Sequence, residues 1–509
     1  MLWPFIVVFS LLGGFWLSWR YKNRRLIHLA SKFPGPKTWP FIGNALLFMV
    51  KPEDLSNVVK KLLVQYGDAI RFWLGPDLNV VISDPDDIKA LLSSAKTTYK
   101  GPQYKYMADV IGEGILSGSG TKWRRHRKIA TPNYGKRAIE NYTNTFNIEV
   151  DSLLTNLRKK RTEQQFNIYD DIVLTTSYAI CQTLMGLSKD QTLNLPYLYE
   201  VIETSPSMYD TVFNRMTKWY LQIDPIFWLT SAYRRQRYFI KIMSECCQKI
   251  LQHRMDRLKT LETESKKNLM SNDEDDVRNT EISVIDRFIL SQELNAAELI
   301  HETFTVFTSS QEASAKISSA LLLMMAYYPN YQEKLYAEIK SILGDEDRWV
   351  DDDDFKRMPY LEMVFKEVLR LFPIGALLQR TVQEDITISS GTIPAGSSLV
   401  IPIYHMHRDV RFWSQPEDFN PERFNPANTA ERQPNCYIPF SLGPMDCLGR
   451  HFGTKLIKTI CVRILNQFEV SSTDKYKDLR LTIAISASPI DGYHLSLRPR
   501  SQNNELHVK

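Results

Sequence analysis

Residues 439–453 read PFSLGPMDCLGRHFG, a stretch that sets one cysteine, Cys447, between two glycines. Gly443 and Gly449 permit tight turns on either side of the cysteine. Apolar side chains recur with helical spacing from Leu448 to Phe468, so Cys447 is predicted to lie at the N-terminus of a helix. The helix dipole and free N–H groups there favour a thiolate, which is suited to be an axial metal ligand. The alternative is a buried free cysteine, the usual state of cysteines in the cytosol.

The cysteine stretch resembles the haem-binding loop of the cytochrome P-450 family of haem-thiolate monooxygenases. The resemblance rests on Phe440-x-x-Gly443-x-x-x-Cys447-x-Gly449. Three more motifs of that family occur in the family's order: Trp123-Arg124-Arg125-His126-Arg127, Glu367-Val368-Leu369-Arg370 and Pro421-Glu422-Arg423-Phe424. Each motif alone is weak, but the four together in this order are very specific, and the resemblance covers essentially the whole chain.

The resemblance implies haem b as the cofactor, with its iron bound by the thiolate of Cys447. It further implies that Trp123, Arg127 and Arg380 contact haem propionates, and that Phe440 belongs to the cofactor-binding loop. A doubly anionic cofactor needs such donors if it is to be held inside a protein.

The same resemblance gives a role to the pair Glu367 and Arg370. By spacing alone this would be a surface ion pair on one helical face, contributing a few tenths of a kcal/mol, about 0.3. In the family the pair instead meets the arginine that corresponds to Arg423, and together they brace the cysteine loop.

Two positions depart from the family pattern. Met445 stands where members usually carry Arg or His, and since methionine donates no hydrogen bond, we expect haem to be held more loosely. Ser309 stands where part of the fatty-acid ω-hydroxylase clan has a glutamate that becomes bonded to haem, so non-covalent haem is expected.

A third departure concerns the distal helix, expected over residues 302–328. Ala313 replaces the threonine that normally helps to deliver protons to iron-bound dioxygen, whereas Glu312 keeps the family's acid. We predict that Glu312 relays protons and that Ser314, or Ser310 one turn earlier, holds a water. The alternative is that these serines only pack or bond backbone carbonyls.

The predicted activity is insertion of one oxygen atom from dioxygen into a lipophilic substrate, with electrons from NADPH. Residues 215–239 and the distal-helix spacing resemble the fatty-acid ω-hydroxylase clan. Aromatic residues of this segment are expected to cover an access channel, to enter the bilayer, or simply to pack: Trp219, Tyr220, Phe227 and Trp228. Because Ala313 weakens proton delivery, two alternatives stay open: an isomerase or dehydratase acting on lipid hydroperoxides, and a haem-binding protein that has lost turnover.

The net charge of +5 is too small to indicate a nucleic-acid partner. The resemblance implies instead that an NADPH–cytochrome reductase, a flavoprotein, docks on the thiolate side of haem, with cytochrome b5 as a second candidate donor. Basic residues expected on this side are residues 123–128 and Arg450, Lys455 and Lys458. The alternative is an ordinary solvated basic face.

Residues 1–20 are predicted to form a membrane anchor. Residues 2–19 carry no charge, and in a helix they would reach roughly 27 Å, just enough to cross the hydrocarbon core. Basic residues start at Arg20 and none precedes them, which places the remaining chain in the cytosol. We therefore expect a single-pass anchor in the endoplasmic reticulum membrane, with a bilayer as partner; the alternative is a buried core helix.

The remainder is predicted to be one large α+β domain, predominantly α-helical, over residues 46–500. A basic and proline-rich hinge, residues 21–45, separates it from the anchor, and residues 501–509 form a polar tail. Residues 259–279 are charged and lack aromatics, which indicates an exposed loop.

Overall fold

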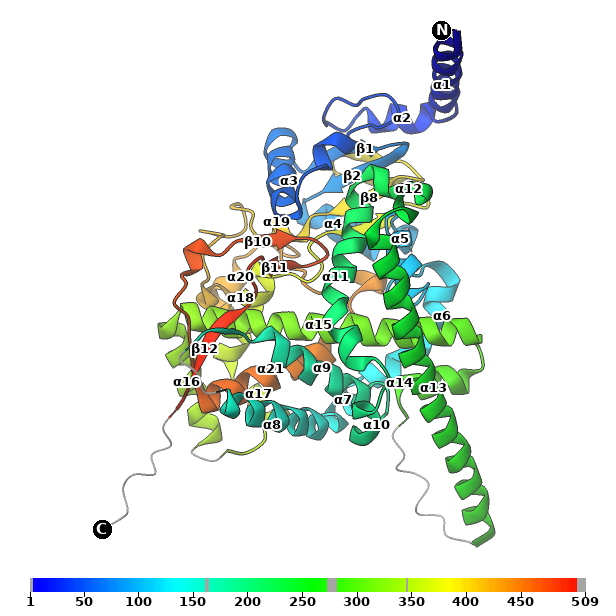
Figure 1. Ribbon diagram of the computed structural model, residues 1–509. Helices are drawn as coiled ribbons and strands as arrows, with labels where there is room; N and C mark the ends of the chain where they lie inside the picture. The colour runs from blue at the N-terminus through cyan, green and yellow to red at the C-terminus, as the bar shows by residue number, and fades with distance from the viewer. Residues whose placement is uncertain (1–2, 161–163, 272–281, 345–346, 501–509) are drawn as a thin grey trace, which may run out of the picture.

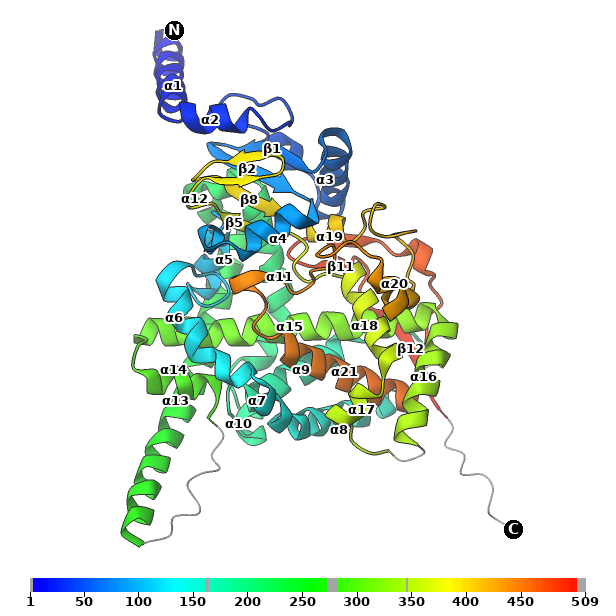
Figure 2. The same ribbon diagram turned by 180° about the vertical axis from the view of Figure 1, so that it is seen from behind.

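The computed structural model describes residues 3–160, 164–271, 282–344 and 347–500. It is predominantly helical, with small sheets built from both ends of the chain. Helix α15 (Ala296–Tyr327) crosses the middle of the molecule in both views (Figures 1 and 2). The predicted α+β class with a helical majority is therefore confirmed.

The helices frame α15 on all sides. Their bounds are α1 Trp3–Lys22, α2 Arg24–Ala30, α3 Pro52–Tyr66, α4 Pro85–Ser93, α5 Tyr104–Ile111, α6 Gly120–Ala130, α7 Lys136–Asn141, α8 Thr143–Lys159, α9 Tyr169–Thr183, α10 Lys189–Leu193, α11 Leu198–Thr217, α12 Asp224–Trp228, α13 Ser231–Ser271, α14 Val284–Ser291, α16 Pro329–Leu343, α17 Asp352–Lys356, α18 Pro359–Leu371, α19 Ile403–Met406, α20 Pro426–Ala430 and α21 Arg450–Gln467.

The strands are short. Their bounds are β1 Ala69–Leu74, β2 Asp77–Ile82, β3 Tyr99–Lys100, β4 Phe166–Asn167, β5 Leu378–Thr381, β6 Ile386–Ile388, β7 Gly391–Ile393, β8 Ser398–Ile401, β9 Phe468–Ser471, β10 Leu481–Ile483, β11 Ala487–Pro489 and β12 His494–Pro499.

The largest sheet joins distant parts of the chain in the order β1-β2-β8-β5-β3. Strands β2 and β8 pair in parallel and the other neighbours are antiparallel. The register of β3 with β5 sets Lys100 opposite Arg380, although the two are far apart in sequence. The sheet thereby brings two cations to the edge of the site described below.

Helix α15 has clear signals at both ends. The Asn295 side chain accepts from the backbone N–H of Glu298 while the Glu298 side chain accepts from that of Asn295, a reciprocal N-terminal cap. At the other end Pro329 prevents the helix from continuing. Between these ends most side chains are buried, packed chiefly by α9 and α21. A helix buried on nearly every side gives the site a rigid wall.

Only the later part of the N-terminal region, from Trp19 onward, packs on the sheet. Helix α1 projects from the body (Figure 1), and the Trp19 ring meets the Trp73 ring of β1 edge-on at 5.6 Å. Residues 24–30 of the predicted hinge are helical, and the proline segment then runs along β1, where the N–H of Arg71 donates to the Pro34 carbonyl at 2.9 Å. Among the described residues, no helix combines the length and apolarity that a membrane crossing requires, so the anchor over residues 1–20 is not confirmed.

The predicted loop over residues 259–279 is wrong for its first part. Helix α13 continues to Ser271, because residues 259–271 contain neither Pro nor Gly. A charged segment that extends an already formed helix needs no apolar face of its own. Residues 272–279, like the predicted tail 501–509, lie outside the described residues.

Candidate active site

Cys447 lies on a loop whose backbone is held by its own hydrogen bonds. The N–H of Cys447 donates to the Phe440 carbonyl at 2.9 Å, and the loop leads into α21 at Arg450, confirming the predicted helix start. Gly443 has a φ of 74°, and a Cβ there would lie 2.1 Å from the Leu92 carbonyl oxygen. Only glycine fits this turn, which fixes where the cysteine points.

The thiol of Cys447 opens onto an internal cavity. Burial raises its pKa, and the Gly449 N–H, Arg450 and Arg127 only partly oppose this effect. A metal cation on the sulfur would reverse the balance, because a coordinating thiol is deprotonated outright. The cysteine thus fits the role of a metal ligand.

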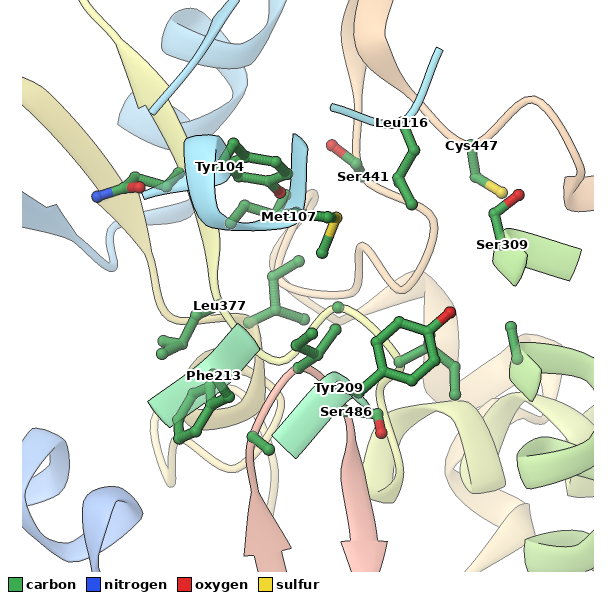
Figure 3. Close-up of a pocket in the computed structure, with 18 of the residues that line it drawn as sticks. Tyr104, Met107, Leu116, Tyr209, Phe213, Ser309, Leu377, Ser441, Cys447 and Ser486 are labelled. Atoms are coloured by element: carbon green, nitrogen blue, oxygen red, sulfur yellow. The ribbon is translucent and has the colours of Figure 1, made fainter. Parts of the chain in front are cut away.

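The cavity has a volume of about 600 Å³ and is walled mainly by apolar side chains. Figure 3 shows Met107, Leu116, Phe213 and Leu377 facing it, with Cys447 and Ser309 at one end. An enclosed apolar space of this size, with few polar groups, is typical of a small-molecule site.

Two cations, the buried Arg380 and the half-buried Lys100, line the cavity without carboxylate partners among the described residues. Arg380 is 2% exposed and donates only to the Gln379 carbonyl at 3.0 Å, besides touching the Tyr104 side chain. Burial lowers the pKa of Arg380, and burial together with Arg380 and Arg127 lowers the pKa of Lys100 well below its usual value. A charge held away from water without a partner is energetically costly, so an anion bound beside Arg380 and Lys100 would stabilise them. A propionate-bearing haem fits them.

Lys100 was missed by the sequence reasoning. In the sequence Lys100 is one lysine in a polar run. It lies beside Arg380 because β3 pairs with β5, which joins residues 280 positions apart. Met445, the predicted weak point, is buried and lines the same cavity. Lys100 places a further cation on the wall of this cavity.

The other predicted contacts also line the cavity. Trp123 is buried, and the Arg127 guanidinium lies 5.5 Å from its ring centroid. Arg127 donates to the carbonyl and carboxylate of Asp446 at 2.8 and 2.6 Å, which ties α6 to the cysteine loop. Phe440 lines the cavity as well, so the structure brings together all the residues predicted to hold the cofactor.

The predicted distal residues lie on the α15 wall. Glu312 forms an ion pair of 2.7 Å with Lys316, one turn on, and the Lys316 ammonium also donates to Ser486 at 2.8 Å. Ser314 is buried and faces α21, where a Cβ at Gly453 would lie 3.7 Å from its hydroxyl oxygen.

Ser309, in contrast, turns its hydroxyl toward Cys447 (Figure 3) and donates to the Thr305 carbonyl at 2.6 Å. Nothing in the sequence marked Lys316 as the partner of Glu312, because an i,i+4 lysine is ordinary on a solvated helix and unusual only when buried.

The Glu367–Arg370 pair is fully buried, so the surface interpretation is wrong. Its two charged hydrogen bonds measure 2.7 and 2.8 Å, and Arg423 approaches Glu367 at 3.4 Å, as the resemblance implied. Arg370 also donates to the carbonyls of His407, Pro416 and Asp418. The triad thus fixes the long segment that leads into the cysteine loop.

His407 continues this support as a neutral acceptor. Its ring nitrogen Nε2 accepts from the Ile438 N–H at 3.0 Å, and burial together with Arg370 and Arg408 lowers its pKa to about 3.

Acidification is therefore expected to destabilise the fold. Between pH 6.5, the ordinary value, and about 3, unfolded His407 binds a proton that folded His407 does not. The free energy of unfolding then falls as pH falls, by up to about 1.4 kcal/mol per pH unit for this one group. In urea titrations from pH 7 to 4, His407→Asn is expected to be less stable at neutral pH but to have a shallower slope. An unchanged slope contradicts this account.

The predicted basic face is only partly present. Lys455 and Lys458 are buried and form ion pairs with Asp352 and Glu362, because α17 and α18 cover this side of α21. Arg450 remains accessible and faces Asp446. Of the predicted basic residues 123–128, which lie on α6, Arg124 and Arg125 are exposed.

The aromatic residues of 215–239 separate into two groups. Trp219 and Trp228 are exposed, with Trp228 at 56%. Phe227 is buried and packs on the Arg215 guanidinium, whose carbon lies 4.0 Å from the ring centroid. Packing therefore explains Phe227 but not the two tryptophans.

The chain resembles known proteins along nearly its whole length. The family model "Cytochrome P450" matches residues 33–494. The chain is 30% identical over 509 residues to "Cytochrome P450 4c3" of Drosophila melanogaster, covering 97% of this chain and 95% of that protein. It is 28% identical over 478 residues to "Cytochrome P450 4V2" of Mus musculus, covering 92% and 90%. With Cys447, its loop and the buried cations on one cavity, these matches establish that the chain belongs to the cytochrome P450 family.

Proposed function

We propose that this cytochrome P450 monooxygenase inserts one oxygen atom into a lipophilic substrate with electrons from NADPH, delivered by a flavoprotein reductase. The observation that carries the proposal is the apolar cavity of about 600 Å³, which has the Cys447 thiol at one end. The family binds haem b through a cysteine thiolate, and this cofactor supplies the redox chemistry that activates dioxygen. The protein's own residues bind, orient and protect the reactants.

We assign the cofactor contacts to residues around that end. Arg380, Lys100 and Arg127 would hold the two propionates, with Trp123 and Phe440 beside them. Arg127 reaches the propionates only by sharing or releasing Asp446, to which it is bonded. Cofactor binding and the position of the cysteine loop are thereby coupled.

Arg380→Met is expected to speed haem loss about 10- to 100-fold, the range seen when a group that supports a metal site is removed. The measurement is the rate of haem transfer from the variant to an excess of apomyoglobin. Lys105→Met, an exposed lysine on neighbouring α5, is the matched control and should leave the rate unchanged. Equal rates for the two variants would show that Arg380 holds no propionate.

We assign proton handling on the α15 wall to Glu312 with Ser314, as predicted from the sequence. Lys316 holds the Glu312 carboxylate at 2.7 Å, so Glu312 is positioned before substrate arrives. Ser314, two residues on, also lines the cavity, where its hydroxyl can hold a water.

Ser314→Ala is expected to lower the product formed per NADPH about tenfold or more, within the range for a lost proton-transfer group. Ser309→Ala serves as the matched control, since its hydroxyl is already bonded to the Thr305 carbonyl. The measurement compares NADPH consumed with product and hydrogen peroxide formed. Equal coupling in both variants, close to the unmodified protein, would remove Ser314 from the relay.

We propose that the molecule associates with the endoplasmic reticulum membrane through its N-terminal segment, with the catalytic domain in the cytosol. Large apolar side chains of α1 are exposed, among them Trp3, Leu11 and Phe15. Trp219 and Trp228, beside the cavity's α11 wall, are placed to touch the same lipid surface. The reductase, or cytochrome b5, would dock on the opposite, α6 side near Arg124 and Arg125.

The deciding experiment reconstitutes the haem-loaded protein with its reductase in lipid. Products are followed from fatty acids, sterols, xenobiotics and lipid hydroperoxides, with and without NADPH. The proposal requires oxygenated product only when NADPH is present. Rearranged hydroperoxide without NADPH would make the protein an isomerase, and no product from any compound would make it a haem-binding protein without turnover.

A further inference from the structure

The cavity has a second polar cluster that the cofactor does not account for. It consists of Lys316, Glu312, Ser486 and Asp210, all of which line the cavity. In Figure 3, Ser486 lies beside Tyr209 across the pocket from Cys447. We propose that this cluster binds a hydroxyl group of an otherwise apolar substrate.

The Lys316 ammonium is the donor of the cluster. An ammonium group carries three N–H donors, and two of them are directed to Glu312 at 2.7 Å and to Ser486 at 2.8 Å. The Ser486 hydroxyl is also 3.1 Å from that of Ser488, so the serines are satisfied within the protein. One donor of Lys316 is left for an acceptor in the cavity.

Asp210 is the acceptor of the cluster. It forms no hydrogen bond or ion pair with any residue that the structure describes, although it lines an apolar cavity. Its neighbour Tyr209 donates to the Thr308 carbonyl at 2.9 Å, which fixes this part of α11 against α15. Burial raises the pKa of Asp210 and Lys316 lowers it, so the two charges sense each other across the space. Asp210 is exposed and lines the apolar cavity, so its carboxylate needs a donor once an apolar substrate displaces water from that space.

The charges select among ligand groups. A substrate carboxylate would face two protein carboxylates, Asp210 and Glu312, against the one ammonium of Lys316. An alkyl ether or ester accepts from Lys316 but leaves Asp210 without a donor. A hydroxyl group both donates and accepts, so it alone satisfies Asp210 and Lys316 together. A fatty acid would instead enter with its carboxylate away from the cluster.

This inference rests on the proposed function, because it takes the cavity as the substrate site. The test measures binding rather than turnover, by equilibrium dialysis of the haem-loaded protein with tritiated 1-dodecanol. Unlabelled dodecyl methyl ether and dodecanoate compete for the site. The three probes have the same alkyl chain length and differ only in the polar group at its end.

We expect 1-dodecanol to bind about five- to tenfold more tightly than the ether, as for one hydrogen bond. Asp210→Asn should weaken this preference and strengthen dodecanoate binding about tenfold by removing a like charge. Glu203→Gln, an exposed carboxylate two turns earlier on α11, is the matched control and should change neither.

Each other result has a definite meaning. Equal affinity for alcohol and ether, or a preference that Asp210→Asn leaves intact, overturns the inference while the proposed function stands. Tightest binding of dodecanoate in the unmodified protein identifies Lys316 as a carboxylate anchor instead. If no probe binds and no compound of the product panel is oxygenated, the proposed function fails, and the inference fails with it.

Discussion

Cys447→Ala is expected to abolish oxygenation completely, the largest effect of any single substitution in this chain. The Cys447 sulfur lines the cavity, the family binds haem iron through a cysteine thiolate, and alanine has no atom that binds iron. The loop itself should survive, because its turn depends on Gly443 and on backbone hydrogen bonds that the substitution leaves in place. The measurement combines the haem absorption spectrum, haem content and NADPH-dependent product.

Cys436→Ala provides the matched control. Cys436 precedes Cys447 by eleven residues, is buried, and does not line the cavity. Its removal should cost about 1 kcal/mol of stability for lost packing while the thiolate spectrum and the product remain. If Cys447→Ala kept the thiolate spectrum, or if both variants lost activity together, the assignment of the iron ligand would be wrong.

A feature of the fold or the site could be predicted from the sequence when its signal lies within a few neighbouring residues. The cysteine loop and the start of α21 were predicted because their signals lie within a few neighbouring residues. The buried state of Glu367 and Arg370 required the family resemblance, since spacing alone favoured a surface pair. The Lys100–Arg380 register and the Lys316–Ser486 contact were out of reach, because each joins segments that only the tertiary fold brings together. The Lys316–Glu312 pair has ordinary helical spacing, and only its burial depends on the tertiary fold.

The same reasoning explains the two surface errors. Lys455 and Lys458 look exposed in sequence, but α17 and α18 bury them and provide Asp352 and Glu362 as partners. The charged run after residue 258 looks like a loop because it has no apolar stripe, yet it extends α13. The charge of a lysine predicts its exposure only where no other element places a carboxylate beside it. Charge content does not predict backbone conformation.

Arg370→Met is expected to lower the free energy of unfolding by about 3–5 kcal/mol, the cost of leaving a buried charge without its partner. Glu367 is 0% exposed and would keep only the Asn420 N–H and Arg423, which lies 3.4 Å away. The three carbonyls that Arg370 binds would also lose their donor. Because these carbonyls belong to the segment that leads into the cysteine loop, haem content should fall as well.

Two further variants separate the buried pair from general damage. Lys366→Met removes a neighbouring, partly exposed lysine from an ion pair with Glu362 and should cost no more than about 0.5 kcal/mol. The double variant Glu367→Gln with Arg370→Met removes the stranded charge and should recover part of the loss, since neutral groups are cheaper to bury than a lone carboxylate. Urea denaturation of all three at pH 7 measures the differences. A stability for Arg370→Met equal to that of Lys366→Met would show that burial of the pair contributes nothing, and the loop would then have to be held by its glycine turn and by His407 alone.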